Sequence, residues 1–212
     1  MIYVFPSEEK PIRQGDIFAD IPRASVALSE LPMVTEEDAR IVSWAAIANE
    51  GKTIKAILPV TPVNAIVATQ DCDTKTSVEI TLCEIQPFVQ VEGKAKETKS
   101  PKKWQSIITQ HARINQKWFY LPPDPQIGFT EKMGVDFRRT IRVTREDLEE
   151  FRNHRKGALN SIAQQHFRER IAQFFRRYAY NEWYSLDAEE FKAYEKDRRC
   201  VVEPKYPWQI GE

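Results

Sequence analysis

Two apolar segments joined by a polar turn stand at the centre of the hydrophobic pattern. The first, residues 65–68, is uniformly apolar, which predicts a strand buried on both faces. The second, residues 78–85, alternates apolar and polar positions, which predicts a strand with one wet face. Residues 71–77 between them are rich in turn formers. We therefore expect the two strands to form a hairpin.

Shorter patterns predict strands on either side of this hairpin. In residues 14–22 the apolar positions alternate after Gly15, and the strand is expected to stop at Pro22. Residues 117–121 and 140–143 are two further strands. Residues 23–62, which give no single clear pattern, form a long insertion before the central strand.

The pattern changes to a helical period near residue 144. Thr144 and Asp147 have the spacing of a helix cap, and Gly157 is expected to stop the short helix that follows. Residues 159–178 place apolar side chains at steps of three and four, which predicts a longer amphipathic helix. We expect an α+β protein with an elaborated β-domain at 1–143, a helical extension packed on it at 144–199, and an extended tail at 200–212.

Composition narrows the class of protein. The 212 residues suit one domain with an attached helical part. No apolar run approaches the roughly 18 residues of a membrane span, and the N-terminus lacks the basic region of a secretory signal. We therefore expect a cytoplasmic protein without membrane contact. The three cysteines have no metal-like spacing, so we expect reduced thiols, no metal and no cofactor.

Charge is balanced overall but unevenly distributed. The chain has 31 basic and 31 acidic residues. Residues 1–92 hold 7 Lys/Arg and 14 Asp/Glu, whereas residues 138–178 hold 11 and 5. Either the acidic and basic parts pack on each other, or the basic part binds an acidic partner or nucleic acid.

The densest group of reactive side chains lies at the central turn. Asp71, Cys72 and Asp73 follow Thr69, and Asp16 joins them if the first strand lies beside the central one. One property argues against a catalytic role with Cys72 as nucleophile. The neighbouring carboxylates raise the pKa of its thiol and so disfavour the reactive thiolate. The favoured alternative is a turn in which both carboxylates cap backbone amides and Cys72 points into the core.

Two basic sets are candidates for binding. The first combines cations with aromatic rings that can stack on bases, namely Arg138, Arg139, Arg142, Trp104 and Trp118. The second lies on the predicted long helix as a candidate partner surface, namely Arg168, Arg170, Arg176 and Arg177. A solvated helix face is the competing interpretation for the second set.

With these elements placed, the layout resembles the MazF/PemK family of toxins. The resemblance rests on the sequence Gly-Asp-Ile at residues 15–17, the apolar strand at 65–68 ending in a polar turn, and the strand ending in Pro87. Residues 135–145 are similar to the later strand of that family, which precedes a C-terminal helix. The resemblance implies an SH3-like β-barrel, here with insertions and followed by C-terminal amphipathic helices.

Family members cleave single-stranded RNA without metal, but this chain departs from their pattern. The family usually has an arginine just before the second strand, where this sequence has Val63 and Asn64. We therefore expect a non-catalytic binding or regulatory module of a prokaryotic toxin–antitoxin or defence system, which contacts a protein partner or single-stranded RNA. The alternative is a metal-independent endoribonuclease using Asp16, Thr69, Asp71 and Arg138.

Overall fold

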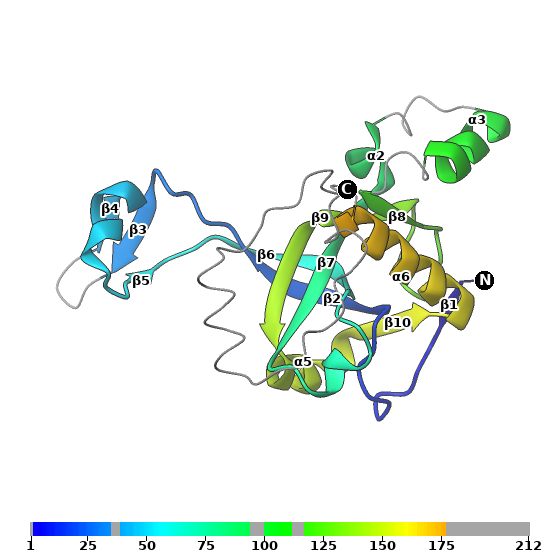
Figure 1. The fold of residues 1–212 in the computed structure, drawn as a ribbon, viewed down its shortest axis with the longest axis horizontal. Helices are drawn as coiled ribbons and strands as arrows, with labels where there is room; N and C mark the ends of the chain where they lie inside the picture. Colours follow the sequence, from blue (N-terminus) through cyan, green and yellow to red (C-terminus); the bar gives the residue numbers. More distant parts are fainter. Residues whose placement is uncertain (1, 35–38, 94–99, 112–116, 177–212) are drawn as a thin grey trace, which may run out of the picture. The chain divides into compact units, whose positions relative to one another are not determined.

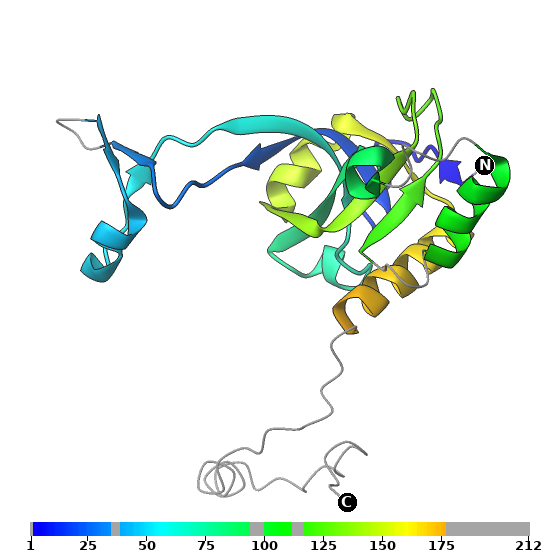
Figure 2. The same ribbon diagram turned by 90° about the horizontal axis from the view of Figure 1, so that it is seen from above.

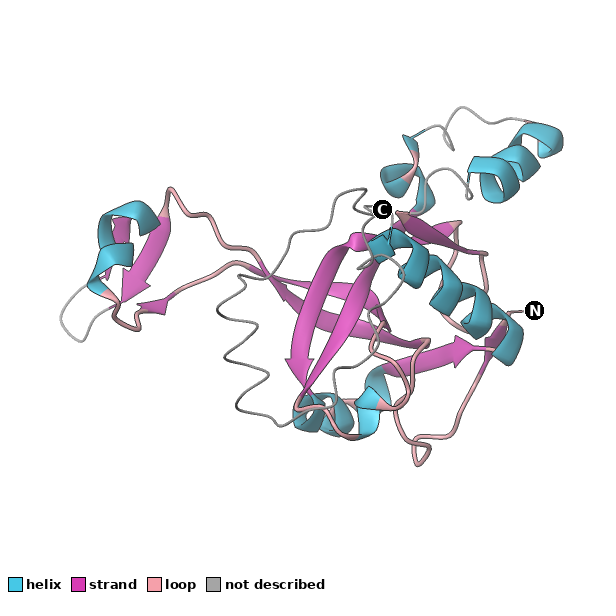
Figure 3. Ribbon diagram, in the orientation of Figure 1, coloured by secondary structure: helices cyan, strands magenta, loops and turns pink. Residues whose placement is uncertain are grey.

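The computed structural model describes residues 2–34, 39–93, 100–111 and 117–176. By contacts the chain divides into two units, Met1–Phe174 and Phe175–Glu212. The first unit is α+β, with antiparallel strands and a few helices (Figures 1 and 3). The last part of the predicted helical extension, residues 177–199, and the tail at 200–212 lie outside the described residues.

Seven strands form the main sheet, in the order β1-β10-β2-β6-β7-β9-β8 and with every pair antiparallel. Their bounds are β1 Tyr3–Val4, β2 Asp16–Ala24, β6 Val60–Val67, β7 Glu79–Pro87, β8 Trp118–Leu121, β9 Met133–Thr144 and β10 Arg155–Leu159. The predicted central hairpin is confirmed as β6 and β7. An insertion does separate β2 from β6, but it is shorter than the predicted 23–62, because residues 23–24 belong to β2 and residues 60–62 to β6, where they pair with each other.

The insertion carries a second, smaller sheet. Its order is β4-β3-β5, with bounds β3 Leu31–Val34, β4 Ala39–Val42 and β5 Lys55–Ala56. A helical turn follows β4, made of α1 Trp44–Ile47 and the 3₁₀ segment η1 Ala48–Glu50.

The remaining helices are short, except the last. They are η2 Asp73–Lys75, α2 Phe88–Val91, α3 Pro101–Ser106, the π-helical η4 Ile107–His111, α5 Arg145–Glu150, η5 Arg152–His154 and α6 Ser161–Arg176. The predicted cap at Thr144 is confirmed, because its hydroxyl accepts a hydrogen bond from Asp147 N at 3.1 Å. The predicted long helix is confirmed as α6, although it begins two residues later.

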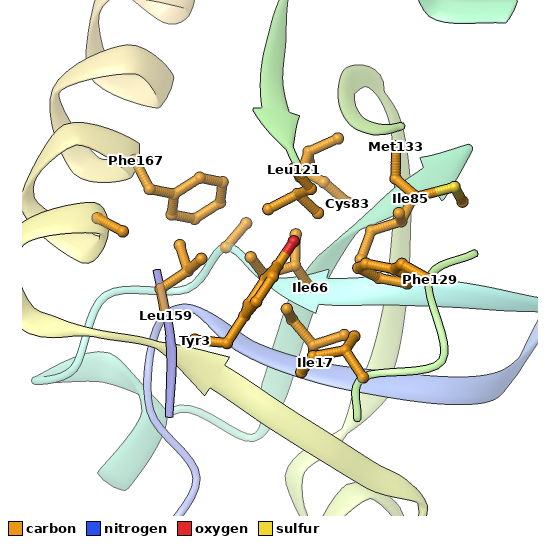
Figure 4. Packing of buried hydrophobic residues seen from close by; sticks show 14 of the residues in the cluster. Tyr3, Ile17, Ile66, Cys83, Ile85, Leu121, Phe129, Met133, Leu159 and Phe167 are labelled. Carbon is orange, nitrogen blue, oxygen red and sulfur yellow. The ribbon is translucent and has the colours of Figure 1, made fainter. Parts of the chain in front are cut away.

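Both faces of the main sheet are covered. On one face a large cluster takes side chains from all seven strands, and Phe167 of α6 closes it (Figure 4). On the other face Leu148 of α5 packs with Phe18, Ile80 and their neighbours. Figure 2 shows α6 as the long helix beside the sheet. The position of α6 explains its apolar stripe, which faces the first cluster.

The two edge strands of the main sheet approach each other. No ladder joins β1 to β8 in the described part of the chain, so the sheet is open. Nevertheless, the Tyr3 hydroxyl in β1 donates to the carbonyl of Pro122, directly after β8, at 2.8 Å. The sheet therefore curls until its first and last strands are within the reach of one side chain.

Three local predictions are wrong. β2 does not stop at Pro22, which lies opposite Pro62 in a pair that continues to Ala24. β7 has no wet face over most of its length, because Ile80 and Leu82 pack in one core cluster and Cys83 and Ile85 in the other. Gly157 does not stop a helix. It lies in β10, where an added Cβ would sit 2.4 Å from Ile127 Cδ1.

The domain boundary expected at 143/144 falls within the first unit. β10 follows α5 in the chain but returns to pair with β1 and β2. Residues on both sides of 144 therefore contribute to one sheet. Such non-local pairing leaves no trace in the local periodicity of the sequence.

Candidate functional site

Asp71 ties together three parts of the chain. Its Oδ1 accepts a hydrogen bond from Gln14 N at 2.8 Å, and its Oδ2 contacts the guanidinium of Arg168. Gln164 Nε2 lies 3.4 Å from the same Oδ2. Gln164 and Arg168 are one turn apart on α6, so both reach the turn that follows β6. The side chain of Asp71 thus links the entry to β2, the end of β6 and α6.

Gln14 is the buried centre of this network. Its side chain is 1% exposed, donates to Ala68 O at 2.7 Å, and accepts from Arg168 Nε at 2.7 Å. Its own carbonyl accepts from Gln164 Nε2 at 2.5 Å. Because the polar groups of this amide are paired, it fixes the turn before β2 against β6 and α6.

Asp16 lies at the same end of β2 but belongs to a separate ion pair. Arg155 Nη1 lies 2.9 Å from Asp16 Oδ2, and Arg13 N donates to that oxygen at 3.2 Å. Burial raises the pKa of the Asp16 carboxyl above its usual range, although Arg155 and Arg13 act in the opposite direction. The carboxylate is therefore bound by cations and shielded from solvent.

The other candidates of the central turn serve local structure. The Thr69 hydroxyl accepts from Thr81 N at 2.8 Å and extends the pairing of β6 with β7. Asp73 begins η2. Cys72 is exposed, contrary to the expectation that it points into the core. Thr74 takes that place instead, since it is buried and its hydroxyl donates to Asp71 O at 3.0 Å.

A basic cavity of about 380 Å³ opens beside Asp71. Four cations line it, namely Lys10, Arg13, Lys75 and Arg155, together with an apolar wall that includes Phe5. Phe5 is 45% exposed. Neither lysine forms an ion pair in the described part of the chain, whereas Arg155 is held by Asp16. Two cations and an exposed ring therefore remain available to an anionic ligand.

The predicted arginines of β9 are paired with carboxylates. Arg138 binds both oxygens of Asp136 at 2.8 and 2.6 Å, and Arg139 Nη1 lies 3.6 Å from Glu84 Oε2. Asp136 and Glu84 are opposite each other in the register of β7 and β9, and both are buried. Two buried carboxylates on directly opposed residues are stable in the charged form only when cations pair with them. Arg23 Nη1 also binds Glu84, at 2.9 Å from each oxygen.

The remaining candidates are more dispersed. Arg142 Nη1 lies 3.6 Å from Glu79 Oε2 at an exposed position. Trp118 is 2% exposed, and its indole N–H donates to Glu92 at 3.4 Å. Trp104 packs edge-on against Phe88, and Lys132 Nζ lies 3.9 Å from the centre of its ring.

The four arginines predicted as a partner surface on the long helix do not form one group in the structure. Arg168 belongs to the Asp71 network, and Arg170 is partly buried on the same helix. The side chain of Arg176 and all of Arg177 lie outside the described residues. The structure therefore gathers one of the four predicted arginines with the predicted carboxylate, by an ion pair that the sequence analysis did not anticipate.

Sequence reasoning missed the residues that build the cavity. Lys10 and Arg13 stand in an entry segment without regular pattern, and they meet Lys75 because β2 pairs with β6. The sequence did contain one indication of the hydrogen-bond network around Asp71. Gln164 and Arg168 are four residues apart on the predicted helix, on the polar border of its apolar stripe.

Comparison with known proteins adds no family. A scan of family models found no match, and a search of curated proteins found none. Within the described residues, no group of three or more His, Cys, Asp or Glu side chains is placed to hold a metal ion. None of the described helices combines the length and apolar character needed to cross a membrane.

Proposed function

We propose that this chain is a non-catalytic module that binds single-stranded nucleic acid through the basic cavity beside Asp71. The observation that carries the proposal is the pair of lysines, Lys10 and Lys75, that face this cavity without a carboxylate partner among the described residues. Phosphate groups are bound by such cations, and an exposed ring such as Phe5 offers a surface on which a base can stack.

The arrangement of the predicted catalytic residues supports a binding role rather than cleavage. Asp16 is buried against Arg155, and Thr69 is occupied by the backbone of Thr81. General acid–base catalysis requires groups within reach of the substrate. We accordingly propose a regulatory or binding member of a prokaryotic toxin–antitoxin or defence system.

The fold that we propose is an SH3-like barrel of the MazF/PemK type. Two features support it: one core cluster that draws on all seven strands, and the contact of Tyr3 with Pro122 across the edges of the sheet.

Titration of a fluorescent single-stranded RNA, followed by anisotropy, tests the binding role. We expect the Lys10→Glu/Lys75→Glu variant to bind at least about tenfold more weakly and its salt slope to fall by about 2. The control is Lys102→Glu/Lys103→Glu, which makes the same charge change at two exposed positions of α3. Equal affinity of wild type and the cavity variant would overturn the proposal.

A metal-independent endoribonuclease is the second candidate, favoured by the position of Asp71 at the border of the basic cavity. The same RNA, incubated with protein in EDTA and run on a denaturing gel, separates the two functions. Intact RNA supports the binding module. Discrete cleavage by wild type that Asp71→Asn abolishes would replace it with the ribonuclease.

A further inference from the structure

The basic cavity is lined by parts of the chain that are distant in sequence. The N-terminal segment supplies Phe5, Lys10 and Arg13, and the segment η2 supplies Lys75. Arg155, at the start of β10, also lines the cavity, although its side chain is only 2% exposed. The fold thus brings four cations and one aromatic ring to a single small cavity.

Positive charge exceeds negative charge at this cavity. Among the described residues that line it, Asp71 alone is acidic, and its carboxylate contacts the guanidinium of Arg168. Asp16, which is completely buried, is paired with Arg155 at 2.9 Å and lies 3.6 Å from Arg13. The two carboxylates are outnumbered by five cations when the two lysines are counted, which leaves an excess of three positive charges for an anionic ligand.

A small cavity with this much charge suits an end group better than a continuous strand. Sites that follow a nucleic-acid backbone spread their cations along a groove, which covers about 4–16 nucleotides in an OB fold. Here the excess charge converges on about 380 Å³, near the lower end of the roughly 300–1,000 Å³ typical of small-ligand pockets. A phosphate within a strand carries a single negative charge, whereas a terminal phosphate monoester carries about 1.5–2 at pH 7 and presents three acceptor oxygens.

We propose that the basic cavity binds the terminal phosphate of single-stranded RNA, an inference that rests on the proposed binding role. The cavity lysines, Lys10 and Lys75, donate to the phosphate oxygens, and Arg13 and Arg155 add to the positive potential. The base of the terminal nucleotide stacks on the exposed ring of Phe5. The 5′ end and the 3′ end of an RNA can both carry this monoester, so the phosphate chemistry is common to both.

The backbone that carries each lysine is held by an arginine from a later element. Lys10 N donates to Ser7 O at 3.1 Å, and Arg155 Nη2 donates to the same carbonyl at 2.6 Å. Lys75 O accepts a hydrogen bond from the guanidinium of Arg145 at the start of α5. Because little backbone has to be ordered when the ligand binds, less conformational entropy is lost and the affinity is higher.

Fluorescence anisotropy with three RNAs of one sequence tests this inference. The RNAs carry an internal fluorophore and differ only in their ends: a 5′-phosphate, a 3′-phosphate, or hydroxyls at both ends. We expect wild type to bind one phosphate-ended RNA at least about tenfold more tightly than the hydroxyl-ended RNA. In the Lys10→Gln/Lys75→Gln variant this ratio should fall to about twofold or less, because the two free cations of the cavity are lost.

Two controls separate recognition of the end from an effect of total charge. A hydroxyl-ended RNA that is two nucleotides longer has about two more negative charges, close to what the terminal phosphate adds, and its affinity should rise by about twofold or less. The Lys102→Gln/Lys103→Gln variant loses the same charge at two exposed positions of α3 and should keep the full preference for the phosphate-ended RNA.

Three outcomes distinguish failure of this inference from failure of the binding role. Equal affinity of wild type for all three RNAs would overturn the inference and leave the binding role in place. A preference that survives in Lys10→Gln/Lys75→Gln, or that the longer RNA reproduces, would also overturn it, because the end group is then bound elsewhere or through charge alone. Wild type that binds none of the RNAs would overturn the binding role itself, and the inference with it.

Discussion

Arg155 and Asp16 form a salt bridge with both side chains almost completely buried. The Nη1 atom of Arg155 lies 2.9 Å from Asp16 Oδ2, and the side chains are 2% and 0% exposed. Arg155 also donates to the carbonyls of Ser7 and Glu8, at 2.6 and 3.3 Å. This arginine thus holds the N-terminal segment against β2 and β10, and it positions the wall of the basic cavity.

Loss of Arg155 is expected to be more damaging than loss of the charge on Asp16. Arg155→Met leaves a buried carboxylate without its closest cation, so it should cost about 3–5 kcal/mol in the free energy of unfolding. Asp16→Asn leaves the buried guanidinium without its counter-ion and should cost about 1–3 kcal/mol, because Arg155 keeps its backbone carbonyl partners. Urea denaturation measures both. Equal costs would contradict this asymmetry.

The pH dependence of stability provides a second test of the same pair. Because burial raises the pKa of Asp16 in the folded state, the folded protein binds its proton more tightly than the unfolded chain does. The stability due to Asp16 is therefore complete below about pH 3.9 and declines as pH rises through the raised pKa. Without Arg155 this pKa rises further.

We accordingly expect the cost of Arg155→Met to be largest at neutral pH and to shrink toward pH 4. Unfolding free energies of wild type and variant between pH 4 and 7 measure the trend. Asp16→Asn, which cannot titrate, is the control. A cost of Arg155→Met that is constant or grows toward acid would show that the carboxylate is not the reason for the loss.

The sequence predicted individual elements better than it predicted which elements pack together. Residues 65–68 and 159–178 have strong local patterns, so the central strand and the helix α6 were both found. By contrast, Gly157 resembles a helix stop in sequence. Its actual role depends on the approach of Ile127, which is distant in the chain. Local pattern indicates an element, but it does not reveal which element packs against a glycine.

The candidate site illustrates the same limit. The sequence drew attention to Asp71 because reactive groups cluster around it, yet its partners Gln14 and Arg168 lie 57 and 97 residues away. The cavity lysines were missed for the same reason. Their common location follows from the pairing of β2 with β6, and no spacing in the sequence encodes it.

Gln14 should matter more to stability than the visible ion pair of Asp71 with Arg168. Gln14→Ala leaves buried partners unpaired, including Ala68 O, and is expected to cost about 1–3 kcal/mol. Arg168→Met should cost less, about 1–1.5 kcal/mol. Its ion pair with Asp71 contributes little because both side chains are more than 40% exposed, so the main loss is the hydrogen bond from Arg168 Nε to the buried oxygen of Gln14.

Chemical denaturation of the two variants, with Gln173→Ala as control, tests this order. Gln173 lies on the same helix and donates an exposed hydrogen bond to Glu169, so its loss should change stability by about 0.5 kcal/mol or less. If Arg168→Met proved the more costly substitution, the ion pair rather than the buried amide would hold α6 to the turn.

The two described cysteines are expected to differ sharply in reactivity. Burial raises the pKa of Cys83 to about 12, with a smaller contribution from the charge of Asp136, so its reactive thiolate is scarce at neutral pH. Cys72 is exposed in the turn after β6. In a Cys200→Ser background, a thiol reagent such as DTNB should label one cysteine rapidly and a second on unfolding. Adding Cys72→Ser should abolish the rapid phase. A rapid phase that survives in this variant would place Cys83 within reach of solvent and contradict its burial in the core cluster.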